Sequence, residues 1–310
     1  MARAHGKVIL LGEHAVVYGM PAIAAGIDQG ARAEARRARP ARLRIGALSA
    51  GPTEPSELGR AFSALLAALD ATDIEVDVTL DLPPGCGLGA SAAIGVAVAR
   101  AVIDKVAAPT TRARARAELV LAAATEWERV FHGNPSGIDT AAAAAGGCIN
   151  YRKGVGPSAV RLAAPLPLAI AVAGPPASTR AMVEKVARQR ERDPRGVGEL
   201  LEAIADLVRR AQAPLTTGNL LELGQLLDEN HRCLCELQVS SPALDRACAE
   251  AREAGALGAK LTGAGGGGAV IALTRGDAEP VLQAWRKAGL TGFAARVVAH
   301  HPPGNESGGT

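Results

Sequence analysis

A glycine-rich stretch carries the first residues whose type and spacing could do chemistry. Residues 83–93 read Pro-Pro-Gly-Cys-Gly-Leu-Gly-Ala-Ser-Ala-Ala. They follow an alternating apolar and polar run at 74–80, which is typical of a strand, and precede a proline-free apolar segment at 92–107, which is typical of a buried helix. A glycine loop between strand and helix exposes backbone N–H groups at the positive end of the helix dipole, where phosphate binds.

Residues 83–93 match neither common nucleotide motif. No Gly-Lys-Ser/Thr closes the loop as in a Walker A motif, and the glycine spacing and the opening Pro-Pro differ from a dinucleotide fingerprint. On these residues alone, a phosphate loop and a tight turn without a ligand are equally good interpretations, because a single glycine motif is weak support.

Other polar residues stand where the apolar pattern breaks. Lys7 leads into a predicted strand at 7–11, and Gly12-Glu13-His14 interrupts that strand. Asp139 follows the turn sequence Asn-Pro-Ser-Gly and opens an alanine-rich helix at 140–145. Taken singly, a surface lysine and a helix N-cap aspartate are the better interpretations.

A second glycine cluster, at 258–268, includes Lys260 and precedes a predicted strand at 269–273. The chain has only six lysines against 28 arginines. Lys7 and Lys260 are therefore more informative than any arginine.

Composition limits the classes of function. The chain has 310 residues, 48% of them apolar and only 2% aromatic, so its core is built from Ala, Val, Leu and Ile at close spacing. A net charge of +3 argues against a dedicated nucleic-acid binder. The arginine-rich residues 32–44 lack interleaved aromatic side chains for base stacking, so we expect a solvated edge or loop there.

The chain has five cysteines, an odd number, and they are scattered along the sequence. Cys233 and Cys235 lack a second pair of cysteines that could complete a zinc site with them. Reduced thiols are expected. The sequence shows no signal pattern and no uninterrupted apolar run of membrane-spanning length. We therefore expect a cytoplasmic protein without a membrane partner.

The remaining pattern predicts alternating strands and helices. A boundary is expected near residues 150–167, where Gly, Pro and charged residues punctuate the chain, and the second half suggests a sheet with helices on one face. We predict helices at 58–69, 111–130 (capped by Thr110 or Thr111), 181–237 with breaks near 193–194 and 214–218, 242–255 and 278–288. Strands are predicted at 7–11, after Pro21, and at 74–80, 168–173, 269–273 and 292–298, with a loop at 49–57.

Four stretches, in this order, resemble motifs of the GHMP kinase superfamily and specifically of its mevalonate kinases: residues 6–19, 83–93, 132–139 and 260–268. One motif is weak, but four ordered motifs spread over most of the chain are strong. The resemblance implies an α+β, two-domain GHMP kinase fold with the active site in the cleft between the domains. Expected are an N-terminal ribosomal-protein-S5-like α/β domain at 1–164, a C-terminal ferredoxin-like α+β domain at 165–300 and a disordered tail at 301–310.

The resemblance also implies residue roles. Asp139 and Lys7 would be catalytic, and Ser91 and Glu128 would hold Mg²⁺. The ATP phosphates would lie against Pro84, Gly85, Cys86, Gly87, Leu88, Gly89, Ala90, Ser91 and Ala92. Substrate would contact Lys7, Glu13, His14, Asp139, Thr262, Gly263 and Ala264, and a loop with Ser178 and Thr179 would face substrate or nucleotide.

The implied activity is ATP-dependent phosphorylation of the 5-hydroxyl of mevalonate, with ATP and mevalonate as partners and, because the family is often dimeric, a homodimer. The chemistry suits these residue types. Phosphoryl transfer needs charge neutralisation and in-line positioning. A carboxylate can accept the hydroxyl proton, and a lysine favours the developing alkoxide.

One position departs from the family pattern: Ala90 stands where family loops commonly carry the first of two serines. We expect activity to survive because Ser91 matches the metal-ligating position. The alternatives are a phosphomevalonate kinase, another small-molecule GHMP kinase, a mevalonate-diphosphate decarboxylase and a non-catalytic nucleotide-binding protein. The Glu13-to-Tyr18 segment favours mevalonate kinase over the other kinases, and the His-Gly-Asn-Pro-Ser-Gly segment argues against the decarboxylase. The joint presence of Lys7, Ser91, Glu128 and Asp139 argues against a non-catalytic protein.

Overall fold

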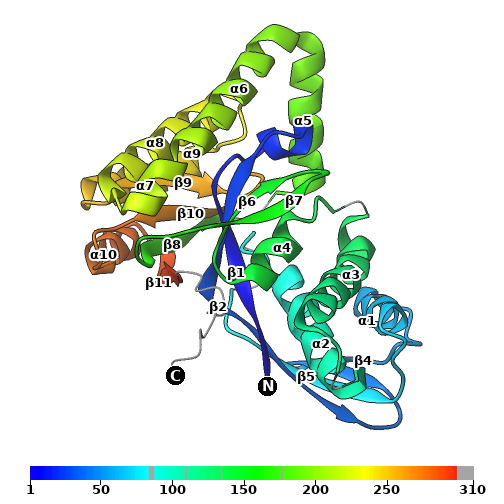
Figure 1. Ribbon diagram of the computed structural model, residues 1–310. Helices are drawn as coiled ribbons and strands as arrows, with labels where there is room; N and C mark the ends of the chain where they lie inside the picture. The colour runs from blue at the N-terminus through cyan, green and yellow to red at the C-terminus, as the bar shows by residue number, and fades with distance from the viewer. Residues whose placement is uncertain (84–86, 109, 134, 176, 299–310) are drawn as a thin grey trace, which may run out of the picture.

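The structure, a computed structural model, describes residues 1–83, 87–108, 110–133, 135–175 and 177–298. Within them, eleven strands form one mixed sheet (Figure 1). The strands are β1 (Ala2–Leu11), β2 (Ala22–Arg37), β3 (Arg42–Ile45), β4 (Leu48–Ala50), β5 (Ile74–Leu80), β6 (Cys148–Arg152), β7 (Gly156–Val160), β8 (Leu166–Gly174), β9 (Gly258–Thr262), β10 (Gly268–Leu273) and β11 (Thr291–Val297).

The helices form the layers around this sheet. They are the short 3₁₀ helix η1 (Ala15–Tyr18) and α1 (Glu57–Ala68), α2 (Ala90–Val106), α3 (Ala113–His132), α4 (Ile138–Ala145), α5 (Thr179–Arg192), α6 (Pro194–Arg210), α7 (Gln212–Thr217), α8 (Leu220–Glu236), α9 (Pro242–Glu253) and α10 (Glu279–Lys287). The α+β class expected from the sequence is confirmed.

Strand β2 holds the sheet together. The strand order is β4-β3-β5-β2-β11-β8-β10-β9, with β1 and β6 also paired to β2 and β7 paired to β6. Every pairing is antiparallel except that of β3 with β5. At Ile27, β2 meets Val297 of β11, so the strands from the two ends of the chain are joined through one register position.

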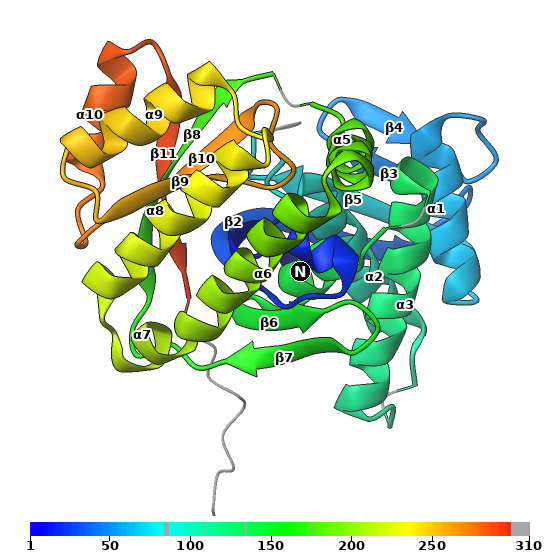
Figure 2. The same ribbon diagram turned by 90° about the horizontal axis from the view of Figure 1, so that it is seen from above.

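Helices segregate by position along the chain. Helix α2 packs on β1 and β2, with α3 against it and α1 against α3, while α8 and α9 cover β9 and β10 (Figure 2). Helices α5 and α6 extend away from the sheet as a hairpin (Figure 1). Helix α2 buries mainly Ala, Gly, Val and Ile, so neighbouring elements approach it closely, as the low aromatic content predicts.

Most predicted elements are confirmed, and the helix predicted at 181–237 breaks at Asp193 as expected. Its second break, expected at 214–218, was misplaced: α7 covers most of that range, and the helix is interrupted at Ala211 and at 218–219. Strand β9 was missed because all five of its residues are buried, which removes any alternation from its sequence. Strand β7 was missed because it carries Gly, Pro and Ser and is largely exposed. The β6–β7 hairpin thus occupies much of residues 150–167, where a domain boundary was expected.

Two further expectations were wrong. The loop expected at 49–57 begins inside strand β4, and helix α3 starts after Arg112 without a side-chain cap, so neither Thr110 nor Thr111 caps it. The arginine-rich stretch at 32–44 belongs largely to β2 and β3.

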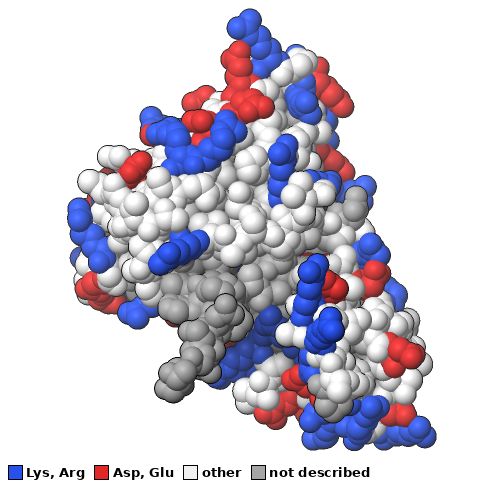
Figure 3. Space-filling model, viewed as in Figure 1, with Lys and Arg blue, Asp and Glu red and all other residues white. Residues whose placement is uncertain are grey.

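Surface charge is mixed. Arg36 and Arg44 in the arginine-rich stretch both pair with Glu75. On the face in Figure 3, blue and red side chains lie interspersed, without a continuous basic band. Among the described residues, no helix is long and apolar enough to cross a membrane.

Two helical glycines should respond oppositely to alanine. A Cβ at Gly198 in α6 meets nothing within 4 Å, whereas a Cβ at Gly224 in α8 would lie 2.2 Å from the carbonyl oxygen of Leu257. We expect Gly198→Ala to raise the unfolding free energy by about 0.5–1 kcal/mol through helix propensity. Gly224→Ala should lower it by about 1–3 kcal/mol, because the backbone must shift. Urea unfolding followed by circular dichroism measures both, and equal effects at the two positions would contradict the packing described.

Candidate active site

The outer edge of strand β1 brings three sequence motifs together. One edge of β1 pairs with β2. On the other, the Lys7 N–H donates to the Leu88 carbonyl (2.8 Å), and the Ile9 N–H donates to Thr262 Oγ1 (2.8 Å). The Thr262 hydroxyl donates back to the Ile9 carbonyl (3.2 Å). The first glycine loop and the C-terminal glycine motif are therefore attached to one strand, two residues apart.

Lys7 and Asp139 form an ion pair beside the first glycine loop. Lys7 Nζ lies 2.9 Å from Asp139 Oδ1, and it donates to the Gly87 carbonyl at 3.3 Å. The lysine side chain is 5% exposed and the aspartate 39%. A Cβ at Gly89 would lie 2.7 Å from Lys7 Cγ, so glycine there lets the lysine stem pass. The interpretation of Lys7 as a surface residue is wrong, and its carboxylate partner remains accessible.

Asp139 sits in the first turn of α4 but does not cap it. The N-cap is Gly137, in the left-handed region at φ 86°. The hydroxyl of Tyr151 donates to the carbonyl of Ser136 and so holds the preceding turn. A carboxylate in the first turn is favoured by the helix dipole. The N-cap interpretation of Asp139 is wrong, and its carboxylate stays available to Lys7.

The N-terminus of α2 can receive an anion. Its N-cap, Gly89, offers no side-chain hydrogen bond, and the first backbone bond of the helix runs from Ala93 N–H to the Gly89 carbonyl. The amides of Ala90, Ser91 and Ala92 precede that bond and have no partner within the helix. A Cβ at Gly263 would lie 3.8 Å from the Gly87 carbonyl, so the C-terminal motif reaches this loop. Pro84, Gly85 and Cys86, also predicted to bind phosphate, lie outside the described residues.

Ser91 and Glu128 form a pair of oxygen ligands. The Ser91 hydroxyl donates to Glu128 Oε1 at 2.5 Å, and the Trp127 indole N–H donates to Ser91 Oγ at 3.2 Å. Glu128 is 2% exposed. Burial raises its pKa, an effect that the Ser91 hydrogen bond opposes, and His132 Nε2 lies 3.6 Å from Oε2. A carboxylate and a hydroxyl oxygen are ligands that suit Mg²⁺, which prefers oxygen.

Glu13 and His14 are buried and hold the C-terminal motif. Glu13 pairs with Lys260 and accepts from Asn230 Nδ2 at 3.2 Å. His14 Nε2 donates to the Ala264 carbonyl at 2.9 Å. Burial raises the pKa of Glu13 and lowers that of Lys260, and their mutual attraction opposes both changes. The expected contacts of Glu13, His14, Thr262, Gly263 and Ala264 with substrate stay predictions.

Sequence reasoning missed the partners of this buried pair. Lys260 is fully buried and donates to the carbonyls of Leu261 (2.6 Å) and Ile9 (3.4 Å) as well as to Glu13. One signal was available: Lys260 stands within an apolar stretch. A buried charge needs a partner of opposite sign, so the position of this lysine predicts a buried carboxylate near it. Nothing in the spacing identified Asn230, which lies 217 residues from Glu13 along the chain.

A second cluster consists of His231, Cys235 and Asp245. Its ligand atoms lie close enough together to hold a metal ion, but these side chains are hydrogen-bonded to one another. Leu261 N–H donates to His231 Nδ1 (3.4 Å), which places the imidazole proton on Nε2, 3.3 Å from Asp245 Oδ1. Cys235 Sγ (3.4 Å) and Ser240 Oγ (2.5 Å) donate to the same oxygen. A metal on Nε2 would move the proton to Nδ1, against the Leu261 N–H.

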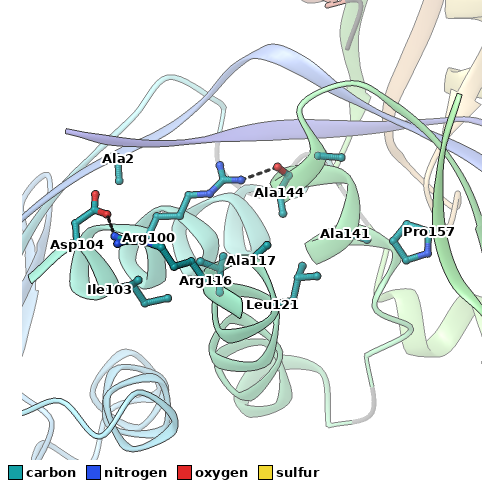
Figure 4. A pocket seen from close by; sticks show the side chains of 12 residues that line it. Ala2, Arg100, Ile103, Asp104, Arg116, Ala117, Leu121, Ala141, Ala144 and Pro157 are labelled. Atoms are coloured by element: carbon teal, nitrogen blue, oxygen red, sulfur yellow. Dashed lines mark hydrogen bonds and ion pairs between the residues drawn. The ribbon is translucent and has the colours of Figure 1, made fainter. Parts of the chain in front are cut away.

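A hollow of about 470 Å³ lies between β1, α2, α3, α4 and β7 (Figure 4). Its charged groups already have partners: Arg116 pairs with Asp104, and Arg100 donates to the carbonyls of Ala144 and Arg3. None of its lining residues belongs to the predicted site. It is therefore distinct from the group around Lys7 and Asp139.

Comparisons with known proteins agree with one another. Residues 57–147 match the family model "GHMP kinases N terminal domain", and residues 200–290 match "GHMP kinases C terminal". The mevalonate kinases of Pyrococcus furiosus and Pyrococcus horikoshii are 34% and 33% identical to the chain, over 96% of it and over 96% and 95% of their own lengths. The crystal structure of L. major mevalonate kinase in complex with R-mevalonate superposes with a TM-score of 0.85 at 30% identity, covering 97% of this chain and 96% of that one.

The His231 cluster should make stability depend on pH. Burial, and then the nearby Lys260, lowers the pKa of His231 to about 4. The unfolded chain binds a proton there below about pH 6.5, whereas the folded protein does so only near pH 4. The unfolding free energy should therefore decrease as pH falls through this window, by up to about 3 kcal/mol from this group.

Urea unfolding at several pH values between 4 and 7, on the parent and on His231→Gln, measures this dependence. The variant should lose much of the slope, while His5 and His14, whose pKa values burial also lowers, keep a remainder. Identical slopes in the two proteins would contradict the assignment.

Proposed function

The chain belongs to the GHMP kinase family, as a full-length relative of mevalonate kinases, and we propose that it transfers the γ-phosphoryl group of ATP to the 5-hydroxyl of mevalonate. The relatives named above carry this activity in their names, and the L. major protein was solved with R-mevalonate bound. The kinase family implies ATP as the phosphoryl donor.

One observation carries the proposal: the Lys7–Asp139 pair, 2.9 Å apart, adjoins the loop that precedes the N-terminus of α2. Consider a substrate hydroxyl that lies with Lys7 and Asp139 on one side and a phosphate bound at α2 on the other. Asp139 would accept its proton, and the ammonium of Lys7 would lie beside its oxygen. Phosphoryl transfer requires this positioning and charge neutralisation more than covalent help.

The residues then divide the work. The amides of Ala90, Ser91 and Ala92, with the helix dipole behind them, bind phosphate oxygens. Asp139 accepts the hydrogen bond from the substrate hydroxyl and orients its oxygen for attack. The ammonium of Lys7 stabilises the negative charge that develops on that oxygen. The 39% exposure of Asp139 lets a hydroxyl reach it.

Mg²⁺ is the metal that we propose for Ser91 Oγ and the Glu128 carboxylate. Both ligands are oxygens, and Glu128 is a buried carboxylate with few partners, which fits a divalent cation. When bound, the ion neutralises charge on the ATP phosphates. Ala90 supplies only a backbone amide where family loops often carry a second hydroxyl.

A phosphomevalonate kinase is the alternative that the charges disfavour. A second substrate phosphate needs additional cations. The two motif lysines are already committed, Lys7 to Asp139 and Lys260 to Glu13. Mevalonate, with one carboxylate, places a smaller demand on positive charge.

Several finer expectations remain proposals. We divide the chain into an N-terminal kinase domain at 1–164 and a C-terminal domain at 165–300. The largely buried β8 begins just after this boundary, at Leu166. We also propose a homodimer and a substrate- or nucleotide-facing role for Ser178 and Thr179, both on the family resemblance alone, and a cytoplasmic location on the sequence pattern described above. The structure does add that Ser178 accepts from Ala181 N–H and caps α5.

Asp139→Asn should lower kcat by about 10²-fold or more, because an amide is a poor proton acceptor of otherwise similar shape. ADP release in a coupled assay with ATP and mevalonate measures it. Asp104→Asn is the matched control, since Asp104 pairs with Arg116 away from the site. Near-parental turnover in Asp139→Asn would remove Asp139 from the reaction.

The substrate assignment predicts a clear ranking. In the same ADP-release assay with mevalonate, phosphomevalonate, galactose and homoserine, kcat/KM should be highest for mevalonate, because the site offers one accessible carboxylate–lysine pair and no spare motif lysine. Higher kcat/KM on phosphomevalonate would favour the alternative kinase. Turnover of none of the four would remove the proposed substrate class.

A further inference from the structure

Trp127 contacts the hydroxyl that the proposed metal site depends on. It precedes Glu128 on α3, and both side chains reach Ser91 on α2. The indole Nε1–H donates to Ser91 Oγ at 3.2 Å, and Ser91 Oγ donates to Glu128 Oε1 at 2.5 Å. The tryptophan is 1% exposed, and the loop resemblance assigns it no role.

These two bonds fix the serine hydroxyl. A hydroxyl has one proton and two lone pairs, and it rotates freely unless its partners constrain it. Here the proton points to Glu128, and one lone pair receives the indole N–H. One lone pair is left in a defined direction. Among the described residues, Glu128 and Trp127 are the only side chains that bond to this hydroxyl, and Ala90 beside it offers none.

The indole ring itself is held in place. On α2, four residues after Ser91, a Cβ at Gly95 would lie 2.7 Å from Trp127 Cδ1, so glycine there makes room for the ring. The ring of Phe131 packs against it with centroids 5.5 Å apart at 52°. The other tryptophan, Trp285, is equally buried but donates its N–H to a backbone carbonyl, that of Ala247, at 2.8 Å.

We propose that Trp127 is a positioning residue for the divalent cation: its indole N–H locks the Ser91 hydroxyl so that one lone pair is presented to the metal of the metal–nucleotide complex. The inference rests on the proposed function. It makes Trp127 a determinant of metal affinity rather than of mevalonate affinity, because its indole N–H bonds to Ser91, which is not among the residues predicted to contact mevalonate.

The test is direct metal binding. Trp127→Phe keeps most of the ring but removes the N–H, and Trp285→Phe makes the same change at the tryptophan outside the site. Free Mn²⁺ is measured by electron paramagnetic resonance in a titration of each protein with Mn²⁺ and ADP. We expect the Kd for Mn²⁺ in the ADP complex to rise about three- to tenfold in Trp127→Phe, the effect of one lost hydrogen bond. Trp285→Phe should match the parent.

A double-mutant cycle separates positioning from packing. In a Ser91→Ala background the hydroxyl is absent, so adding Trp127→Phe should change the Mn²⁺ affinity no further. A loss of the same size in both backgrounds, or parental affinity in Trp127→Phe, would overturn the proposal. In Trp285→Phe, where Trp127 is the one remaining tryptophan, paramagnetic Mn²⁺ with ADP should quench the tryptophan fluorescence and ADP alone should not. An absence of quenching would also overturn it, even if Trp127→Phe fails to fold.

These outcomes are distinguishable from failure of the proposed function. If the parent does not phosphorylate mevalonate but Trp127→Phe still weakens Mn²⁺ binding, the substrate is wrong and the positioning role stands. If the parent phosphorylates mevalonate and Trp127→Phe binds Mn²⁺ with parental affinity, the positioning role is wrong and the function stands. In the active case, the KM for mevalonate should change less than the Mg²⁺ concentration needed for half-maximal rate.

Discussion

The outer edge of strand β1 is the constraint on which the site depends. An unpaired strand edge presents N–H and C=O groups that need partners when they are buried. Here the partners are not the backbone of a neighbouring strand: Lys7 N–H donates to the Leu88 carbonyl, and Ile9 exchanges two hydrogen bonds with the side-chain hydroxyl of Thr262. Because Lys7 and Ile9 are two residues apart, the edge of β1 sets the spacing between the first glycine loop and the C-terminal glycine motif.

The two lysine–carboxylate pairs near this edge differ in what surrounds them. The Glu13–Lys260 pair is sealed, with both side chains at most 1% exposed and further bonds to Asn230 and to backbone carbonyls. Breaking such a pair leaves an uncompensated buried charge, so it acts as a fixed link between β1 and β9. Asp139, in contrast, is 39% exposed. In the proposed reaction it would exchange part of its contact with Lys7 for the substrate hydroxyl at little cost in desolvation.

Local sequence predicted what local physics determines. The strand at 74–80 shows an alternation of apolar and polar residues. Helices α5, α6 and α8 begin at Ser, Asp and Asn caps. The glycine loops can be recognised from their composition. Local sequence could not predict what depends on distant partners. Considered alone, Asp139 favoured an N-cap interpretation and Lys7 a surface one, because neither position reveals the other 132 residues away along the chain. The same limit hid Asn230, and burial on all sides hid β9, whose sequence has no periodicity to detect.

The alanine-rich composition has a consequence for the site as well as for the core. Small residues along α2 allow α3 to lie close enough for Glu128 and Trp127 to reach Ser91, which is 37 and 36 residues earlier in the sequence. A buried indole beside the start of α2 occupies space that its neighbours must leave open, and Gly95 does so. Its N–H must also find an acceptor once it is buried. The acceptor is the Ser91 hydroxyl at the start of α2. The same side chain, Trp127, therefore packs α3 on α2 and orients the proposed metal ligand.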